Sequence, residues 1–224
     1  MFNAIKRIKA TKQHLWFLSK YNFSTEEEIL AEDFFCSFSK AFVVAPHMDD
    51  EIHGSFALIK KLLELKKEVS IVYCISIENG VETTRRIAES KIVFPDVKKI
   101  YLGINDSNAE NEIGILKAKL SNILKSVDSL YVFPEYAVSN HKDHNVVNKV
   151  MEMICAEQNH LLVLKTELII PIKRSCFLKI EKFSEKIKEL EKYKTQKSRI
   201  NYKKISIYLS TSGNRHEFRE HYAK

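Results

Sequence analysis

Residues 41–51 read Ala-Phe-Val-Val-Ala-Pro-His-Met-Asp-Asp-Glu, an apolar run of strand length that leads directly into polar side chains. Its first five residues are apolar without alternation, which is typical of a strand covered on both faces. Similar runs follow at 69–77 (VSIVYCISI), 99–102 and 129–133. Because stretches with helical spacing of apolar residues separate these runs, the sequence predicts a mostly parallel sheet with helices on both faces, a Rossmann-like α/β fold.

The last third of the chain has a different pattern. Residues 161–171 and 175–180 are two consecutive extended runs, and they could add an antiparallel edge to the sheet. A charged helix is predicted over 184–197. The lysine-rich segment 181–204 alternates in sign, which is typical of a solvated face, although such a segment could also attract an anionic substrate.

Residues 1–37 are predicted to be an N-terminal basic and aromatic helical extension, and residues 38–224 to form the main domain. Apolar residues in the first twenty positions fall on one helical stripe, which favours a helix that packs against the main domain. Because basic and aromatic residues are interleaved there, a helix that contacts a membrane surface or a partner protein is the alternative. Peripheral membrane contact therefore stays open.

Composition excludes several classes of protein. Hydrophobic residues make up 45% of the 224 positions, and there are only 5 Gly and 4 Pro, so a disordered or collagen-like chain is excluded. The net charge of +7 permits anionic partners, but no nucleic-acid-reading motif accompanies it, so no nucleic-acid partner is predicted. Four scattered cysteines, no secretory signal pattern and no transmembrane segment favour a reducing, cytoplasmic location. The pattern does not indicate an oligomeric state.

Candidate metal ligands follow two of the predicted strands. His47 and Asp50 come after the first strand, and His144 comes after the fourth. Because the carboxyl ends of parallel strands meet at one edge of a sheet, these side chains are expected to converge. Two imidazoles and one carboxylate hold a divalent cation and leave positions open for water and substrate. The residues alone indicate a divalent cation and do not choose between zinc and iron(II).

The neighbouring residues suggest an acid–base apparatus. Asp49 is offset from the ligands by one position, so it could accept a proton from metal-bound water as a general base. His141 could polarise an oxyanion or protonate a leaving group, and Asp143 is placed to orient one of the rings. The pattern therefore predicts a metal-dependent hydrolase.

These motifs resemble a known family. Residues 46–51 and 141–144 are similar to the (A/P)HPDDE and HPDH signatures of the LmbE-like, or PIG-L, zinc-dependent deacetylases, with Met48 and Lys142 in place of the usual prolines. Residues 86–89 match the family's RxxE helix, and residues 186–196 resemble its late K…Y-x-S/T-Q helix. The resemblance covers about residues 38–224.

The resemblance implies a Rossmann-like fold and removal of an N-acetyl group from an amino sugar or a glycan precursor. It implies metal ligation by His47, Asp50 and His144, with Asp49 as the base. It also implies that His141 and Asp143 act as a relay, and that Arg86 binds substrate or supports the site. Tyr136 is the nearest candidate for the tyrosine that some members carry before the second motif.

Three other interpretations stay open at this stage. Two histidines and a carboxylate also build non-haem iron oxygenases, although those sites usually lie on β-barrels. The chain could instead be a catalytically silent module that binds a sugar or nucleotide sugar. It could also be an amidase that acts on an N-acyl substrate other than a sugar.

Overall fold

The computed structural model describes residues 28–29, 32–78, 81–125, 128–134, 141–158, 161–166, 176–197 and 219–223. Within these ranges, eight strands form one sheet in the order β1-β7-β8-β6-β5-β2-β3-β4. The strands are β1 (Glu28–Ile29), β2 (Lys40–Ala45), β3 (Glu68–Ile77), β4 (Lys98–Asn105), β5 (Ser129–Pro134), β6 (Leu162–Thr166), β7 (Cys176–Lys179) and β8 (Arg219–Ala223).

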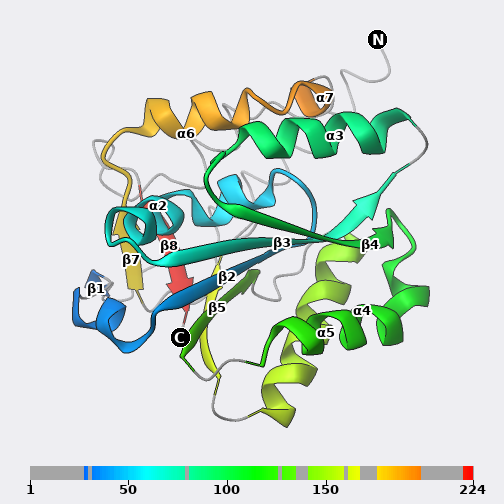
Figure 1. The fold of residues 1–224 in the computed structure, drawn as a ribbon, viewed down its shortest axis with the longest axis horizontal. Helices are drawn as coiled ribbons and strands as arrows, with labels where there is room; N and C mark the ends of the chain where they lie inside the picture. The colour runs from blue at the N-terminus through cyan, green and yellow to red at the C-terminus, as the bar shows by residue number, and fades with distance from the viewer. Residues whose placement is uncertain are drawn as a thin grey trace, which may run out of the picture.

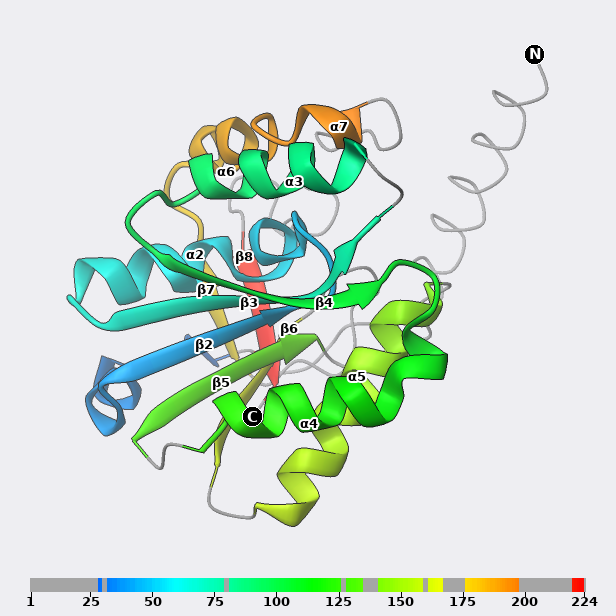
Figure 2. The same cartoon turned by 45° about the vertical axis from the view of Figure 1, so that its right-hand side comes forward.

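Five neighbouring strands, β6-β5-β2-β3-β4, are parallel. The chain builds this sheet outward from β2 through β3 to β4, and then returns to the other side of β2 with β5 and β6. The strand order therefore reverses between β2 and β5, which lie side by side in Figure 2. Ligands of open α/β sheets bind at such a reversal, at the carboxyl ends of the strands. The predicted Rossmann-like architecture is confirmed.

Helices cover both faces of the sheet (Figure 1). One face carries α2 (Asp50–Glu64), α3 (Val81–Ile92), α6 (Phe183–Leu190) and α7 (Lys194–Lys197); the other carries α4 (Ile113–Ile123) and α5 (Lys142–Glu157). Strand residues alternate between the two layers. Val43 joins the core beneath α2 with Leu58, whereas its neighbour Val44 joins the core over α4 and α5 with Leu120 and Val147. Burial of each such side chain contributes about 1.5–3 kcal/mol, which holds the strands in register.

The antiparallel edge is present, but its origin differs from the expectation. β8, from the end of the chain, inserts between β6 and β7 and is antiparallel to both. The two runs predicted to form the edge do not pair with each other in the described residues, because β8 lies between β6 and β7. On their other sides, β6 pairs in parallel with β5 and β7 pairs in parallel with β1. The connection at 167–175 lies outside the described residues.

The described part of the N-terminal extension joins the main core. A 3-10 helix, η1 (Glu32–Ser37), buries Phe35, which contacts Phe38 in the same cluster with ring centroids 6.4 Å apart. The helix predicted in the first twenty residues lies outside the described residues. Nowhere in the described ranges is a helix both long and apolar enough to cross a membrane.

The predicted charged helix over 184–197 is interrupted between α6 and α7. The prediction that this lysine-rich segment presents a solvated face is wrong for Lys186, which is fully buried. Its Nζ donates a hydrogen bond to the carbonyl oxygen of His53, 2.8 Å away in α2. The backbone of α2 leaves helical geometry at Ser55, and the Thr166 hydroxyl caps the neighbouring carbonyl of Gly54. Buried backbone acceptors need such partners, so Lys186 stabilises the break in α2.

Candidate metal centre

The site lies where the strand order reverses. β2 ends at Ala45 and the chain enters α2 at Asp50, while β5 ends at Pro134 and α5 starts at Lys142. Because β2 and β5 are parallel neighbours, the segments that follow them meet at the same edge of the sheet. His47, Asp50 and His144 are thereby brought together, although 97 residues separate the two histidines in the sequence.

The three predicted ligands present one donor atom each to a common point. His47 Nδ1 lies 3.1 Å from His144 Nε2, and Asp50 Oδ2 lies 3.1 Å from the same His144 nitrogen. The third side of this triangle, between His47 Nδ1 and Asp50 Oδ2, is 3.5 Å. Metal–ligand bonds of about 2.0–2.1 Å in a tetrahedral site separate neighbouring ligand atoms by about 3.4 Å. The donor set therefore fits a divalent cation.

The charges around His47 also favour a cation. Its other ring nitrogen, Nε2, lies 3.4 Å from carboxylate oxygens of both Asp106 and Asp143. Burial by itself lowers the pKa of His47, but Asp106, Asp143 and Asp50 raise it well above its ordinary value. Burial likewise opposes ionisation of Asp50, yet His144 and His47 hold the pKa of that carboxyl well below its usual range. Three carboxylates around two imidazoles attract positive charge, and a carboxylate behind a metal-ligating histidine is a common arrangement.

Asp49 occupies the turn between the ligands in an unusual backbone conformation. Its φ is 130°, a region that residues other than glycine rarely adopt. Its side chain is buried and lies 3.7 Å from the guanidinium of Arg86. The same guanidinium donates a hydrogen bond to the carbonyl oxygen of Met48 at 2.5 Å and forms an ion pair with Glu78. In this structure Arg86 thus supports the turn that carries Asp49.

Glu51 points away from the ligands, into the core. Its Oε2 accepts the backbone N–H of Asp49 at 2.9 Å, and its Oε1 accepts the hydroxyl of Tyr193 at 2.6 Å. The Tyr193 hydroxyl lies 3.2 Å from that of Tyr73. The Glu51 side chain is 1% exposed, and this burial raises its pKa to about 7.

His141 is the solvent-facing member of the site. Its side chain is 46% exposed, and its ring lies 4.6 Å from the ring of His47 and 4.7 Å from that of His144, centroid to centroid. The expected partner, Asp143, lies 4.0 Å from His141 Nδ1 and is closer to His47. Burial and the two neighbouring histidines lower the pKa of His141. Tyr136 lies outside the described residues.

Two acidic residues near the site were given no role by the sequence reasoning. Asp106 directly follows β4, at the same edge of the sheet, so the rule that found His47 and His144 could also have found it. Glu78 follows β3 in the same way, and it pairs with Arg86. Both lie in short polar segments that match no motif, which is why they were missed.

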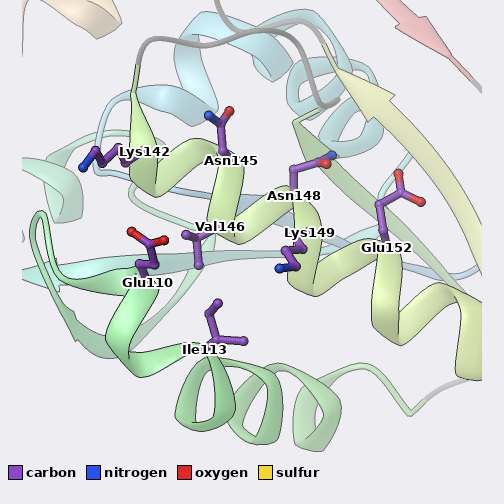
Figure 3. A pocket seen from close by; sticks show the side chains of 8 residues that line it. All are labelled: Glu110, Ile113, Lys142, Asn145, Val146, Asn148, Lys149 and Glu152. Carbon is purple, nitrogen blue, oxygen red and sulfur yellow. The ribbon is translucent and has the colours of Figure 1, made fainter.

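A cleft of about 680 Å³ runs along the outer side of α5, between this helix and the segment that leads into α4 (Figure 3). It is lined by Glu110, Ile113, Lys142, Asn145, Val146, Asn148, Lys149 and Glu152. The candidate metal ligands are not among these residues, so the cleft lies beside the metal centre and not within it.

Solved structures with this fold are numerous but distant in sequence. The N,N'-diacetylchitobiose deacetylase from Pyrococcus horikoshii has a TM-score of 0.70 and 16% identity, over 86% of this chain and 85% of that one. A deacetylase in the biosynthesis pathway of teicoplanin has a TM-score of 0.66 and 13% identity, over 82% and 96%. GalB, the 4-carboxy-2-hydroxymuconate hydratase from Pseudomonas putida KT2440, has a TM-score of 0.55 and 13% identity, over 83% and 95%. At these identities the likeness concerns the fold alone.

Sequence comparison is more specific. Among curated proteins, no sequence matches the chain significantly. The model of the family PIG-L, GlcNAc-PI de-N-acetylase, matches residues 42–155. This match spans just over half of the 224 residues and includes most of β2, all of β5 and the segments that follow them. On this ground the chain belongs to the PIG-L family of GlcNAc-PI de-N-acetylases.

Proposed function

We propose that this protein is a metal-dependent hydrolase that removes the acetyl group from an N-acetylated amino sugar. The observation that carries the proposal is the convergence of His47 Nδ1, Asp50 Oδ2 and His144 Nε2 within 3.1–3.5 Å of one another, with the buried Asp49 in the turn between two of these ligands. The family description, and the deacetylases among the similar structures, support an amide of an amino sugar as the bond that is broken.

His47, Asp50 and His144 would hold the cation, with zinc as the proposed ion and iron(II) as the alternative. When bound, the cation supplies a Lewis acid that polarises the amide carbonyl and makes water more acidic. Asp106 and Asp143 would keep the ring of His47 oriented through its second nitrogen, 3.4 Å from each carboxylate.

The remaining steps fall to groups of this chain. Asp49 accepts the proton of the attacking water, whose oxygen bonds to the amide carbon. His141, on the exposed side of the ligands, donates a hydrogen bond to the developing oxyanion. The carbon–nitrogen bond then breaks, the nitrogen takes up the proton, and acetate and a free amine are released. Arg86 keeps Asp49 in place, because it contacts both that side chain and the carbonyl of Met48.

The thiols of the described residues support a reducing location. Cys36, Cys74 and Cys155 are all free, and burial raises the pKa of the Cys74 thiol. A buried thiol that stays protonated is inert, as expected of a structural cysteine. We propose that the protein acts in the cytoplasm.

The test combines metal analysis with acetate release. The full chain is purified without chelator, and acetate is measured with N-acetylglucosamine, N,N'-diacetylchitobiose, GlcNAc-PI and N-acetylated amino acids as substrates. We expect about one equivalent of zinc or iron per chain, and acetate release from at least one of the sugars that stops on treatment with a chelator. Asp49→Asn should retain the metal and lose turnover by a factor of about 10²–10⁴.

The outcomes separate the alternatives. Acetate release from the amino acids alone would favour an amidase that acts on other N-acyl substrates. Binding of a sugar without acetate release from any compound would favour a silent binding module. Oxygen consumption coupled to a co-substrate, without hydrolysis, would favour an iron oxygenase. Any of these three results would overturn the proposal.

A further inference from the structure

Glu51 joins the turn that carries Asp49 to Tyr193, in the segment between α6 and α7. It is adjacent in sequence to the ligand Asp50, yet its carboxylate faces the core and contacts Tyr193, 142 residues further along the chain. An ordinary acidic residue in the first turn of a helix stays at the surface, where it interacts with the helix dipole. The Glu51 side chain is instead 1% exposed, so it needs specific hydrogen-bond partners.

One of these partners is the backbone of the proposed base. The N–H of Asp49 points at Glu51 Oε2, with a nitrogen–oxygen distance of 2.9 Å. A residue other than glycine with φ near 130° is strained, so the surrounding structure has to hold it. The carbonyl of Asp49 accepts hydrogen bonds from the N–H groups of Ile52 and His53. Its N–H has Glu51 as its partner, so this carboxylate fixes the peptide that carries Asp49.

The other partner is Tyr193, in the short link between α6 and α7. Its hydroxyl donates to Glu51 Oε1 at 2.6 Å, and the Tyr73 hydroxyl from β3 lies 3.2 Å away. The helix that follows this link, α7, is also anchored, because its Thr195 donates its backbone N–H and its hydroxyl to Glu89 of α3. Glu51 is therefore held from the carboxyl-terminal part of the described chain and not by its own helix.

We infer that Glu51 and Tyr193 form a positioning pair that holds Asp49 in its strained backbone conformation and thereby sets the rate of the chemical step. This inference rests on the proposed function, in which Asp49 is the base. Neither residue is among the metal ligands, and neither reaches the exposed side of the site where His141 lies. Their loss should therefore lower kcat and leave the metal content and KM unchanged.

The test uses Tyr193→Phe, which removes only the hydroxyl that donates to Glu51, and Glu51→Gln, which keeps the size of the side chain. We expect kcat to fall about 10- to 100-fold in each, the range typical of residues that orient a catalytic group through a hydrogen bond. Metal content should stay near the wild-type value, and KM should change less than twofold. Glu51→Gln leaves one acceptor oxygen for two donors, the Asp49 N–H and the Tyr193 hydroxyl. Because both changes disturb the same contact, the double variant should lose little more than either single variant.

Tyr101→Phe is the matched control. The Tyr101 hydroxyl bonds to Ser90 Oγ at 2.8 Å, and its ring stacks on Tyr73, so this hydroxyl serves a different hydrogen bond from the one that Tyr193 donates to Glu51. Tyr101→Phe should destabilise the protein about as much as Tyr193→Phe does, but its kcat should equal that of the wild type. All rates are measured at least 15 °C below the melting temperature of the least stable variant, so that unfolding does not contribute.

The results distinguish the inference from the function on which it rests. If wild-type protein releases no acetate, the proposed function fails. If wild-type protein is active and Tyr193→Phe keeps full kcat, the positioning pair fails while the function stands. Equal losses of kcat in Tyr101→Phe and Tyr193→Phe, or loss of the metal from Tyr193→Phe, would also contradict the pair, because they would indicate a general effect on the core or on the ligands.

Discussion

The carboxylate of Asp143 lies against the ring of His47, with Asp143 Oδ2 3.4 Å from His47 Nε2. The same carboxylate oxygen accepts the backbone N–H of Ser107 at 2.9 Å, so the first turn of α5 is tied to the segment after β4. Although burial opposes ionisation, His47 and the Ser107 N–H lower the pKa of Asp143 to about 2. Asp143 is therefore ionised at neutral pH, and its charge faces the ring of a candidate metal ligand.

Asp143→Asn should weaken metal binding about 10- to 100-fold, because the amide presents no charge to the ligand ring. Competition with a fluorescent chelator measures the affinity. Asp106→Asn is the comparison, since Asp106 lies at the same 3.4 Å from His47 but its side chain is 37% exposed, and its effect should be smaller. If Asp143→Asn binds the metal as tightly as wild type does, the Asp143 carboxylate contributes nothing to metal binding through His47, and its role is limited to His141.

Arg86→Met should destabilise the fold by about 3–5 kcal/mol, because it leaves the Glu78 carboxylate buried without its partner. The expected loss is read from urea unfolding at pH 7. Arg85→Met, at the exposed neighbouring position, should change stability by less than about 0.5 kcal/mol. Equal stability of the two variants would mean that the buried ion pair contributes nothing.

Lys186→Met should cost about 1–3 kcal/mol, since the His53 carbonyl in the break of α2 loses its donor. Lys188→Met, on the exposed side of the same helix, is the matched control. Thermal unfolding of the two variants gives the comparison. A Lys186→Met variant as stable as the control would show that the break in α2 does not depend on this ammonium group.

Acidification should lower the free energy of unfolding, in part because His53 takes up a proton more readily in the unfolded chain than in the folded one. Burial lowers the pKa of His53 to about 4, whereas an exposed histidine titrates near 6.5. Between these two pH values the unfolded chain binds a proton that the folded chain does not, so the free energy of unfolding falls as the pH falls, by up to about 3 kcal/mol. Urea unfolding from pH 7 to pH 4 should therefore give a shallower slope for His53→Gln than for wild type. Parallel slopes would contradict this assignment.

Much of the fold follows from local pattern. The strands at 41–45, 69–77 and 129–133 were predictable because each is an unbroken apolar run, and the structure places them in β2, β3 and β5. The convergence of His47, Asp50 and His144 was predictable for the same reason, since the rule on strand ends needs only the order of the elements.

What the sequence could not predict depends on contacts between distant segments. β8 pairs with β6 and β7 across a long intervening segment, and nothing in residues 219–223 indicates those partners. Lys186 falls on the same helical stripe as Phe183 and Leu190, but its partner, the His53 carbonyl at the break in α2, could not be predicted from the sequence. Glu51 belongs to a recognised motif, but its contact with Tyr193 becomes visible only when α6 and α7 are placed over α2.

The most direct test of the account is to titrate metal-free protein with zinc while measuring acetate release from the best sugar substrate. We expect activity to rise in proportion to added zinc and to reach its plateau at one equivalent per chain. His144→Ala should bind the ion at least 100-fold more weakly, because it removes one of three ligands. Full activity in the metal-free protein, or a His144→Ala variant that matches the wild-type titration, would contradict the claim that these three side chains bind the catalytic ion.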